Sequence, residues 1–141
     1  MLVVDANIVA YLLIDGNKTA QARELWTAHR DWWAPRLLFY ELANIFSRLV
    51  RERSLAREAA LAALETGIGL VRMLDREPPP ARVLGIAEKL GLSAYDASYL
   101  ATAELLRVPL VTEDGRVLRT AAPLTLSLAQ ALETVATQGV Q

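Results

Sequence analysis

The first dozen residues constrain the fold more than any other stretch. A short aliphatic run, Leu2 to Val4, ends at Asp5, and an apolar helical pattern begins directly after it. A buried strand that passes straight into a helix is typical of a parallel α/β sheet, whose ligands bind beyond the carboxyl ends of the strands. Asp5 is therefore either the N-cap of the helix or an active-site acid, and its position alone leaves both interpretations open.

The same alternation continues along the chain. Apolar periodicity and turn residues predict further strands near 31–35, 70–74, 108–112 and 124–127, and helices near 6–14, 18–30, 37–53, 57–68, 81–90, 94–107, 115–118 and 128–137. Strands that alternate with helices predict a three-layer α/β/α sandwich with a mainly parallel central sheet. We find no repeat or linker, so we expect residues 1–141 to form a single domain.

Composition excludes several kinds of chemistry. The chain has no cysteine, which rules out disulfides, thiolate catalysis and zinc held by cysteine, and its one histidine, His29, cannot build a histidine-rich metal site. A net charge of −1 gives no general attraction to nucleic acid, so an RNA ligand would need a local basic patch. No apolar run approaches the length of a membrane span and the first residues do not resemble a signal peptide, so we expect a cytoplasmic protein.

Two acids lie early in predicted helices. Glu41 borders the apolar stripe of its helix, on the same edge as Arg48, and taken singly it is typical of a solvated helix flank. Asp96 shares its helix face with apolar neighbours, where an unpaired carboxylate is costly. It either serves the function or closes a capping box with Ser93.

Another acid follows a predicted strand. Asp114 comes after the strand near 108–112, in an Asp-Gly turn, and considered singly it is an ordinary turn residue. Thr112 lies two positions earlier and would direct its hydroxyl towards the same strand end.

The four acids are more informative together. Two of them directly follow predicted strands, and the other two lie early in helices that follow a strand or a turn. In a parallel sheet, such positions converge on one edge. Four carboxylates in one crevice repel one another unless cations neutralise them, and oxygen ligands select Mg²⁺ or Mn²⁺. Water bound to such an ion is a nucleophile near neutral pH, so the pattern points to metal-dependent hydrolysis of phosphodiesters without a histidine base.

These residues resemble a known family. The segments Val3 to Asn7, Pro35 to Asn44, Ser93 to Ala97 and Val111 to Asp114 follow the order and spacing of PIN-domain ribonucleases, with the VapC-type toxins of toxin–antitoxin pairs as the nearest group. One departure is Ala6, where many members have Ser or Thr, and it removes a hydroxyl from the site.

The resemblance implies a PIN-like fold and a metal-dependent endonuclease that acts on single-stranded RNA. It implies that direct or water-mediated ligands of Mg²⁺ or Mn²⁺ come from Asp5, Glu41, Asp96 and Asp114, and that supporting polar groups come from Asn7 and Thr112. It also implies a homodimer and a separately encoded antitoxin that inserts a basic side chain into the acidic pocket.

The RNA contacts are left open by the sequence. Arg48 and Arg51 lie towards the end of the helix near 37–53, and Arg116 and Arg119 follow Asp114. Each pair either contacts RNA phosphates or forms part of a solvated charged face.

Two other functions compete with the nuclease. A non-catalytic PIN-like RNA-binding or scaffold domain would keep the fold without the chemistry, although such a domain would usually have lost one or more of the acids. A phosphotransfer protein with an aspartyl nucleophile needs a lysine in its pocket, and neither Lys18 nor Lys89 follows a predicted strand.

Overall fold

The computed structural model describes residues 1–139, and these residues contain a five-stranded parallel sheet. In the order of the sheet, the strands are β3 (Arg72–Met73), β2 (Trp32–Ala34), β1 (Leu2–Val4), β4 (Leu110–Val111) and β5 (Thr125–Leu126). Each neighbouring pair is parallel. The predicted mainly parallel sheet is confirmed, with β1 at its centre.

The helices lie where the apolar periodicity predicts them. They are α1 (Ala6–Leu13), α2 (Thr19–Ala28), α3 (Leu37–Arg51), α4 (Arg57–Leu70), α5 (Pro80–Leu90), α6 (Ala94–Leu106), α7 (Gly115–Thr120) and α8 (Leu128–Gln138), with a short 3₁₀ helix at Ala122–Leu124. Among the described residues, no helix combines the length and apolar character needed to cross a membrane.

Several element boundaries differ from the prediction by one or two residues, and two of these differences concern the ends of helices. Helix α4 continues to Leu70, so β3 is shorter than the strand predicted at 70–74. The glycines of α4 do not end the helix, because Gly67 lies where the helix approaches the side chains of Leu42 and Leu13. Helix α7 continues to Thr120, two residues beyond its predicted end.

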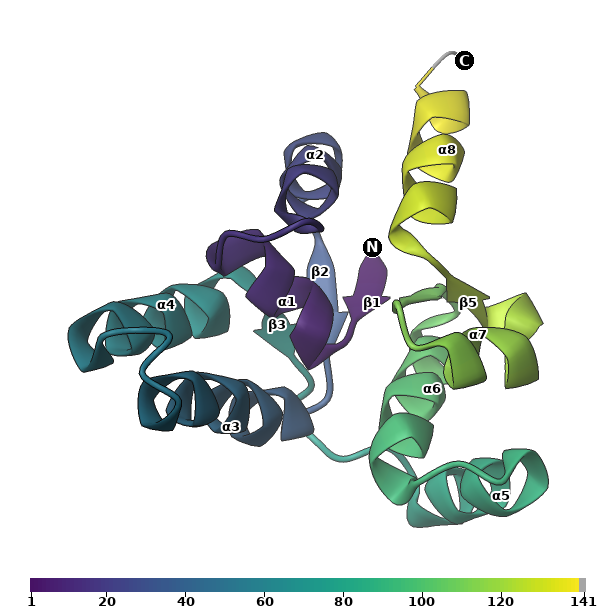
Figure 1. Cartoon of the computed structure of the whole chain (residues 1–141). Coiled ribbons are helices and arrows are strands. Elements are labelled where there is room, and N and C mark those ends of the chain that lie inside the picture. Colours follow the sequence, from purple (N-terminus) through teal and green to yellow (C-terminus); the bar gives the residue numbers. More distant parts are fainter. Residues whose placement is uncertain (140–141) are drawn as a thin grey trace.

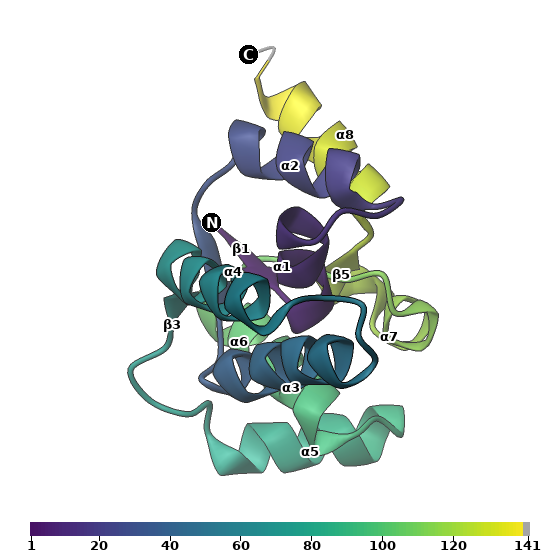
Figure 2. The same ribbon diagram turned by 60° about the vertical axis from the view of Figure 1, so that its left-hand side comes forward.

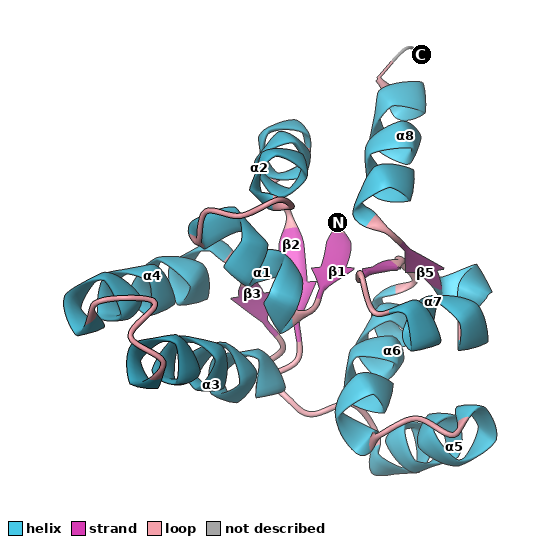
Figure 3. Cartoon of the chain, viewed as in Figure 1, coloured by secondary structure: helices cyan, strands magenta, loops and turns pink. Residues whose placement is uncertain are grey.

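The helices cover both faces of the sheet (Figures 1 and 3). Helices α1, α3 and α4 pack against one another on one side, whereas α5 and α6 pack together on the other side, with α6 against β1 and β4. Helix α8 packs against α2 and β5, and Figure 2 shows α2 and α8 side by side. The predicted three-layer α/β/α architecture is confirmed.

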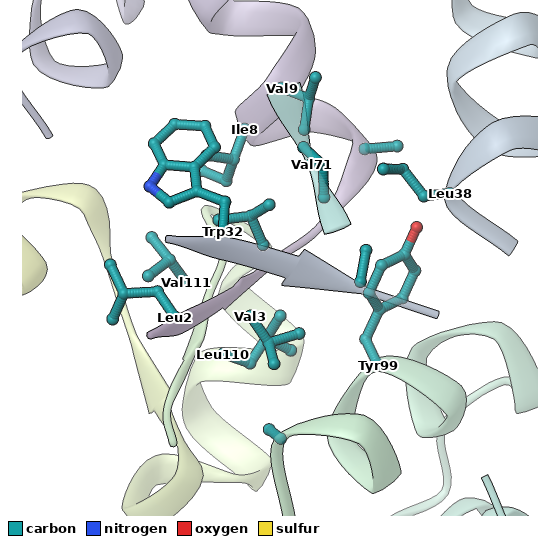
Figure 4. Packing of buried hydrophobic residues seen from close by; sticks show 14 of the residues in the cluster. Leu2, Val3, Ile8, Val9, Trp32, Leu38, Val71, Tyr99, Leu110 and Val111 are labelled. Atoms are coloured by element: carbon teal, nitrogen blue, oxygen red, sulfur yellow. The ribbon is translucent and has the colours of Figure 1, made fainter. Parts of the chain in front are cut away.

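The core is centred on β1, whose three residues are all buried. Strands covered on both faces carry continuous apolar runs, which explains why Leu2 to Val4 shows no alternation. Around them lie the buried side chains of Trp32 from β2 and Leu110 from β4, together with Ile8 from α1 (Figure 4).

The strand order creates a crevice beside β1. The chain runs from β1 outwards to β2 and β3, then returns to the other side of β1 to form β4 and β5. Neighbouring parallel strands whose connections leave in opposite directions open a crevice at their carboxyl ends. Here those strands are β1 and β4, which end immediately before Asp5 and shortly before Asp114.

Candidate active site

A cavity of about 240 Å³ lies at this edge of the sheet, and it contains all four acids that the sequence singles out. Its carboxylates come from the end of β1, from α3, from α6 and from the start of α7: Asp5, Glu41, Asp96 and Asp114. Its other polar lining residues are Asn7, Asn44, Arg48 and Tyr99. Segments more than a hundred residues apart in the chain thus converge as predicted.

Asp5 is held by two different contacts. Its Oδ1 accepts a hydrogen bond from the backbone N–H of Ile8 at 3.1 Å, which makes it the N-cap of α1. Its Oδ2 accepts a hydrogen bond from the Thr112 hydroxyl at 2.6 Å. The residue therefore caps a helix and also lines the cavity, so the two interpretations of Asp5 do not exclude each other.

Thr112 links the ends of β1 and β4. Its side chain is buried, and its hydroxyl donates to Asp5 while accepting a hydrogen bond from the backbone N–H of Asp114 at 3.1 Å. Asp114 in turn caps α7, with Oδ1 accepting from the N–H groups of Arg116 and Val117. The caps of two helices thus fix two of the carboxylates at the cavity.

Glu41 and Asp96 come from helices on opposite sides of the sheet. Asp96 lies at the third position of α6, where its backbone N–H donates to the Ser93 hydroxyl at 3.1 Å. The return bond that would complete a capping box, from the Ser93 N–H to the Asp96 carboxylate, is not formed. The Asp96 carboxylate lines the cavity, as does that of Glu41 from α3.

Burial and mutual repulsion act on these acids. Burial raises the pKa of Asp5 from 3.8 to about 6, against the hydrogen bonds from Thr112 and Ile8, and the charges of Glu41 and Asp96 raise it further. Burial likewise raises the pKa of Glu41 and of Asp96, with additional repulsion from Asp96 on the former and from Asp114 on the latter. Burial is the largest cause of each shift, and negative charge on neighbouring acids adds to it, as expected where carboxylates share a cavity.

Sequence reasoning missed two residues of the cavity. Tyr99 lies on the apolar face of its helix, which predicts packing in the core, but its buried hydroxyl has no hydrogen-bond partner in the described structure. Asn44 lies one helical turn after Glu41 and adds an exposed amide to the wall. Helical spacing from Glu41 and Asp96 was the available signal, since residues three positions apart share a helix face.

The arginines divide into two groups. Arg48 lines the cavity, and its ion pair with Glu52 is long, at 3.9 Å. Arg51, Arg116 and Arg119 are exposed and lie outside the cavity lining. Arg116 donates to the backbone carbonyl of Gly91, and its charge lowers the pKa of Asp96, so it is close to the acidic edge.

The oxygen donors fit a hard divalent cation. Within residues 1–139, no three acidic or histidine side chains are grouped tightly enough to form a preassembled metal cage. The cavity nevertheless offers carboxylate and amide oxygens with no sulfur or imidazole ligand, a donor set that suits Mg²⁺ or Mn²⁺. The pKa values of three of its acids are raised first by burial and then by repulsion between the acids, and a bound cation would offset both effects.

Sequence comparisons identify relatives over most of the chain. Residues 2–123 match the PIN domain. Ribonuclease VapC9 of Mycobacterium tuberculosis is 40% identical over 123 residues, which cover 83% of this chain and 88% of the relative. Exonuclease VapC9 of Pyrobaculum aerophilum is 34% identical over 94 residues, covering 66% of this chain and 70% of the relative.

Solved structures show the same architecture. The crystal structure of PAE2754 from Pyrobaculum aerophilum matches with a TM-score of 0.79 and 27% identity, over 96% of this chain and 95% of that one. VapC20 of Mycobacterium tuberculosis, described as a sarcin–ricin loop cleaving toxin, matches with a TM-score of 0.60 over 82% of this chain and 91% of that one. Its identity is 19%, so it supports the fold alone. The domain match, the relatives and the fold agree, and the chain belongs to the PIN domain family as a relative of the VapC ribonucleases.

Proposed function

We propose that this protein is a metal-dependent endoribonuclease, the toxin of a toxin–antitoxin pair, which hydrolyses RNA phosphodiester bonds in the cytoplasm. The observation that carries the proposal is the convergence of four carboxylates on one cavity in a chain of the PIN family. The names of its curated relatives, which are ribonucleases and an exonuclease of the VapC group, support the same reaction class.

The four acids would hold Mg²⁺ or Mn²⁺ directly or through water: Asp5, Glu41, Asp96 and Asp114. When bound, the ion supplies an activated water molecule and neutralises charge on the phosphate. Thr112 keeps the Asp5 carboxylate in place by donating to Oδ2, and the Ile8 N–H restrains the other oxygen. Asn7 and Asn44 offer amide groups that orient water or substrate at the cavity wall.

The RNA phosphates would bind to arginine side chains beside the acids. Arg48 is the cationic residue of the cavity lining, and its weak pairing with Glu52 leaves the guanidinium able to bind a phosphate. Outside the cavity, further contacts along the RNA chain would come from Arg51, Arg116 and Arg119. A chain with a net charge of −1 depends on such local cations to bind RNA.

The partners follow from the family. We infer a homodimer, and an antitoxin whose basic side chain enters the acidic cavity and blocks it. We also treat residues 1–141 as one domain, because α8 packs back against α2 and β5 rather than forming a separate unit.

One relative is named an exonuclease, and a circular RNA substrate distinguishes the two modes of cleavage. With Mn²⁺ present, we expect linear products from a circular single-stranded RNA, which has no end for an exonuclease to use. Cleavage of linear RNA alone would contradict the endonuclease and support the exonuclease.

The same assay tests the site. We expect Asp5→Asn and Asp96→Asn to reduce cleavage more than about 100-fold, because each removes a proposed ligand of the ion. Asp15→Asn is the matched control, since the Asp15 side chain is 90% exposed and pairs only with Arg23. Full cleavage by either cavity variant, or in excess chelator, would contradict the proposal. A protein that neither cleaves RNA nor binds Mn²⁺ would be the non-catalytic RNA-binding domain.

A further inference from the structure

Tyr99 carries a hydroxyl group that the packing of the core does not explain. The residue is 2% exposed, and its Oη has no hydrogen-bond partner in the described part of the chain. It lies on α6 one turn after Asp96, and it lines the acidic cavity. In Figure 4 the ring extends from α6 and the hydroxyl points towards Leu38, which lies on α3 one turn before Glu41.

The surroundings of the hydroxyl make it a donor. Burial raises the pKa of Tyr99, and the charges of Glu41, Asp5 and Asp96 raise it further, so the phenol keeps its proton at every physiological pH. Glu41 has the largest of these charge effects. Conversely, the hydroxyl lowers the pKa of Glu41, although the contact does not have the geometry of a formed hydrogen bond.

A phenylalanine would fill the same volume without burying a polar group, and burial of an unpartnered hydroxyl costs free energy. Packing alone therefore does not account for the hydroxyl group at this position. The hydroxyl points from α6 towards α3 (Figure 4), and both Tyr99 and Glu41 line the cavity, so a small movement could bring the two side chains together.

We propose that Tyr99 is a positioning residue: its hydroxyl donates a hydrogen bond to the Glu41 carboxylate and holds this acid in the orientation that binds the divalent cation. The inference rests on the proposed function, because it assigns Tyr99 a role at the same metal site. Donors that orient metal-binding carboxylates change metal affinity by about 10–100-fold when they are removed.

The test is Mn²⁺ binding by the full chain without RNA, measured by isothermal titration calorimetry. We expect Tyr99→Phe to weaken Mn²⁺ binding at least about 10-fold. The melting temperature without metal should stay close to that of the wild type, because the variant keeps the buried ring, so weaker Mn²⁺ binding would report on the site and not on folding. The control is Tyr95→Phe on the same helix, whose side chain is 63% exposed and lies outside the cavity lining, and it should bind Mn²⁺ like the wild type.

A double-mutant cycle tests whether Tyr99 acts through Glu41. If it does, adding Tyr99→Phe to Glu41→Gln should cause little further loss of Mn²⁺ affinity. A full additional loss in that background would overturn the proposed route through Glu41. Equal Mn²⁺ affinity of Tyr99→Phe and wild type would overturn the positioning role while leaving the metal site intact. If the wild type binds no Mn²⁺, the metal site itself is wrong and the role of Tyr99 is overturned with it.

Discussion

Asp5 illustrates how one residue can serve structure and function at once. One carboxylate oxygen caps α1 and the other accepts from Thr112, so the side chain has little freedom to turn away from the cavity. The same burial that fixes it also raises its pKa to about 6. The folded protein thus holds an acid whose charged form is less favourable than in water.

Asp5 predicts a pH dependence of stability in the metal-free protein. Its pKa is higher in the folded chain than the reference of 3.8, so between about pH 4 and 6 the folded state binds more protons than the unfolded state. The stability from protonated Asp5 is present below about pH 4 and lost by about pH 6. We expect the free energy of unfolding to fall by about 3 kcal/mol through this one group.

The measurement is urea unfolding in chelator at several pH values, with Asp5→Asn compared with wild type. The variant should match the wild type near pH 4 and be more stable at pH 7, because asparagine keeps the cap without the charge. Asp15→Asn should follow the wild type throughout. An Asp5→Asn protein that is less stable than the wild type at pH 7 would contradict the burial penalty.

At the residue scale, the acids could be predicted and the hydroxyl could not. Asp5 and Asp114 follow apolar strands, and the topology of a parallel sheet brings such positions together. For Tyr99 the sequence shows only an aromatic residue on an apolar helix face, which is typical of the core. Its Oη became distinctive only when the structure showed that it lacked a partner.

At the element scale, periodicity located the helices because most have one buried face and clear start signals. Ser93 and Ser127 cap α6 and α8 as side-chain acceptors, and Gly91 ends α5 in a left-handed conformation. The end of α4 was harder to predict, because two glycines within three residues suggest a helix end. Packing against α1 and α3 decides that boundary, and the sequence does not show this packing.

The two glycines of α4 give opposite expectations on substitution. A Cβ at Gly67 would lie 2.8 Å from Leu42 Cδ2 and 3.0 Å from Leu13 Cδ1, whereas a Cβ at Gly69 would meet nothing within 4 Å. Gly69→Ala should stabilise the protein by about 1 kcal/mol through helix propensity. Gly67→Ala should destabilise it by about 1–3 kcal/mol, because the fully buried side chain of Leu42 would have to shift within the packed core.

The measurement is the free energy of unfolding of both variants in urea. Each variant is the control for the other, because both make the same change in one helix. Stabilisation by both substitutions would show that α4 does not pack tightly on α1 and α3. Destabilisation by both would show that α4 depends on its glycines for a reason other than space.

At the scale of the whole molecule, the sequence predicted the fold class but not the strand order. Each strand has two or three residues, too few to encode its neighbours, and the order depends on pairing between distant segments such as β1 with β4. That pairing decides which acids meet. It places the ends of β1 and β4 side by side, so that Thr112 reaches Asp5 across 107 positions of the chain.

Because the acids repel one another across this crevice, divalent cations should stabilise the whole fold. A ligand that binds only the folded state at 100 times its Kd adds about 2.7 kcal/mol, or about 10 °C in melting temperature for a domain of this size. We expect such a rise with Mn²⁺ or Mg²⁺ at pH 7 in a thermal denaturation experiment. The rise should be smaller at pH 5, below the pKa of about 6 that burial gives Asp5, because protons then compete with the ion for this carboxylate.

Two controls make the thermal shift specific to the cavity. Sodium chloride at equal ionic strength should not reproduce it, because screening acts on all surface charges alike. Asp5→Asn and Asp96→Asn should lose most of the shift, whereas Asp15→Asn should keep it, since Asp15 lies outside the cavity. If the cavity variants gained as much stability from Mn²⁺ as the wild type, the ion would bind elsewhere, and the four acids would owe their proximity to helix capping and sheet topology alone.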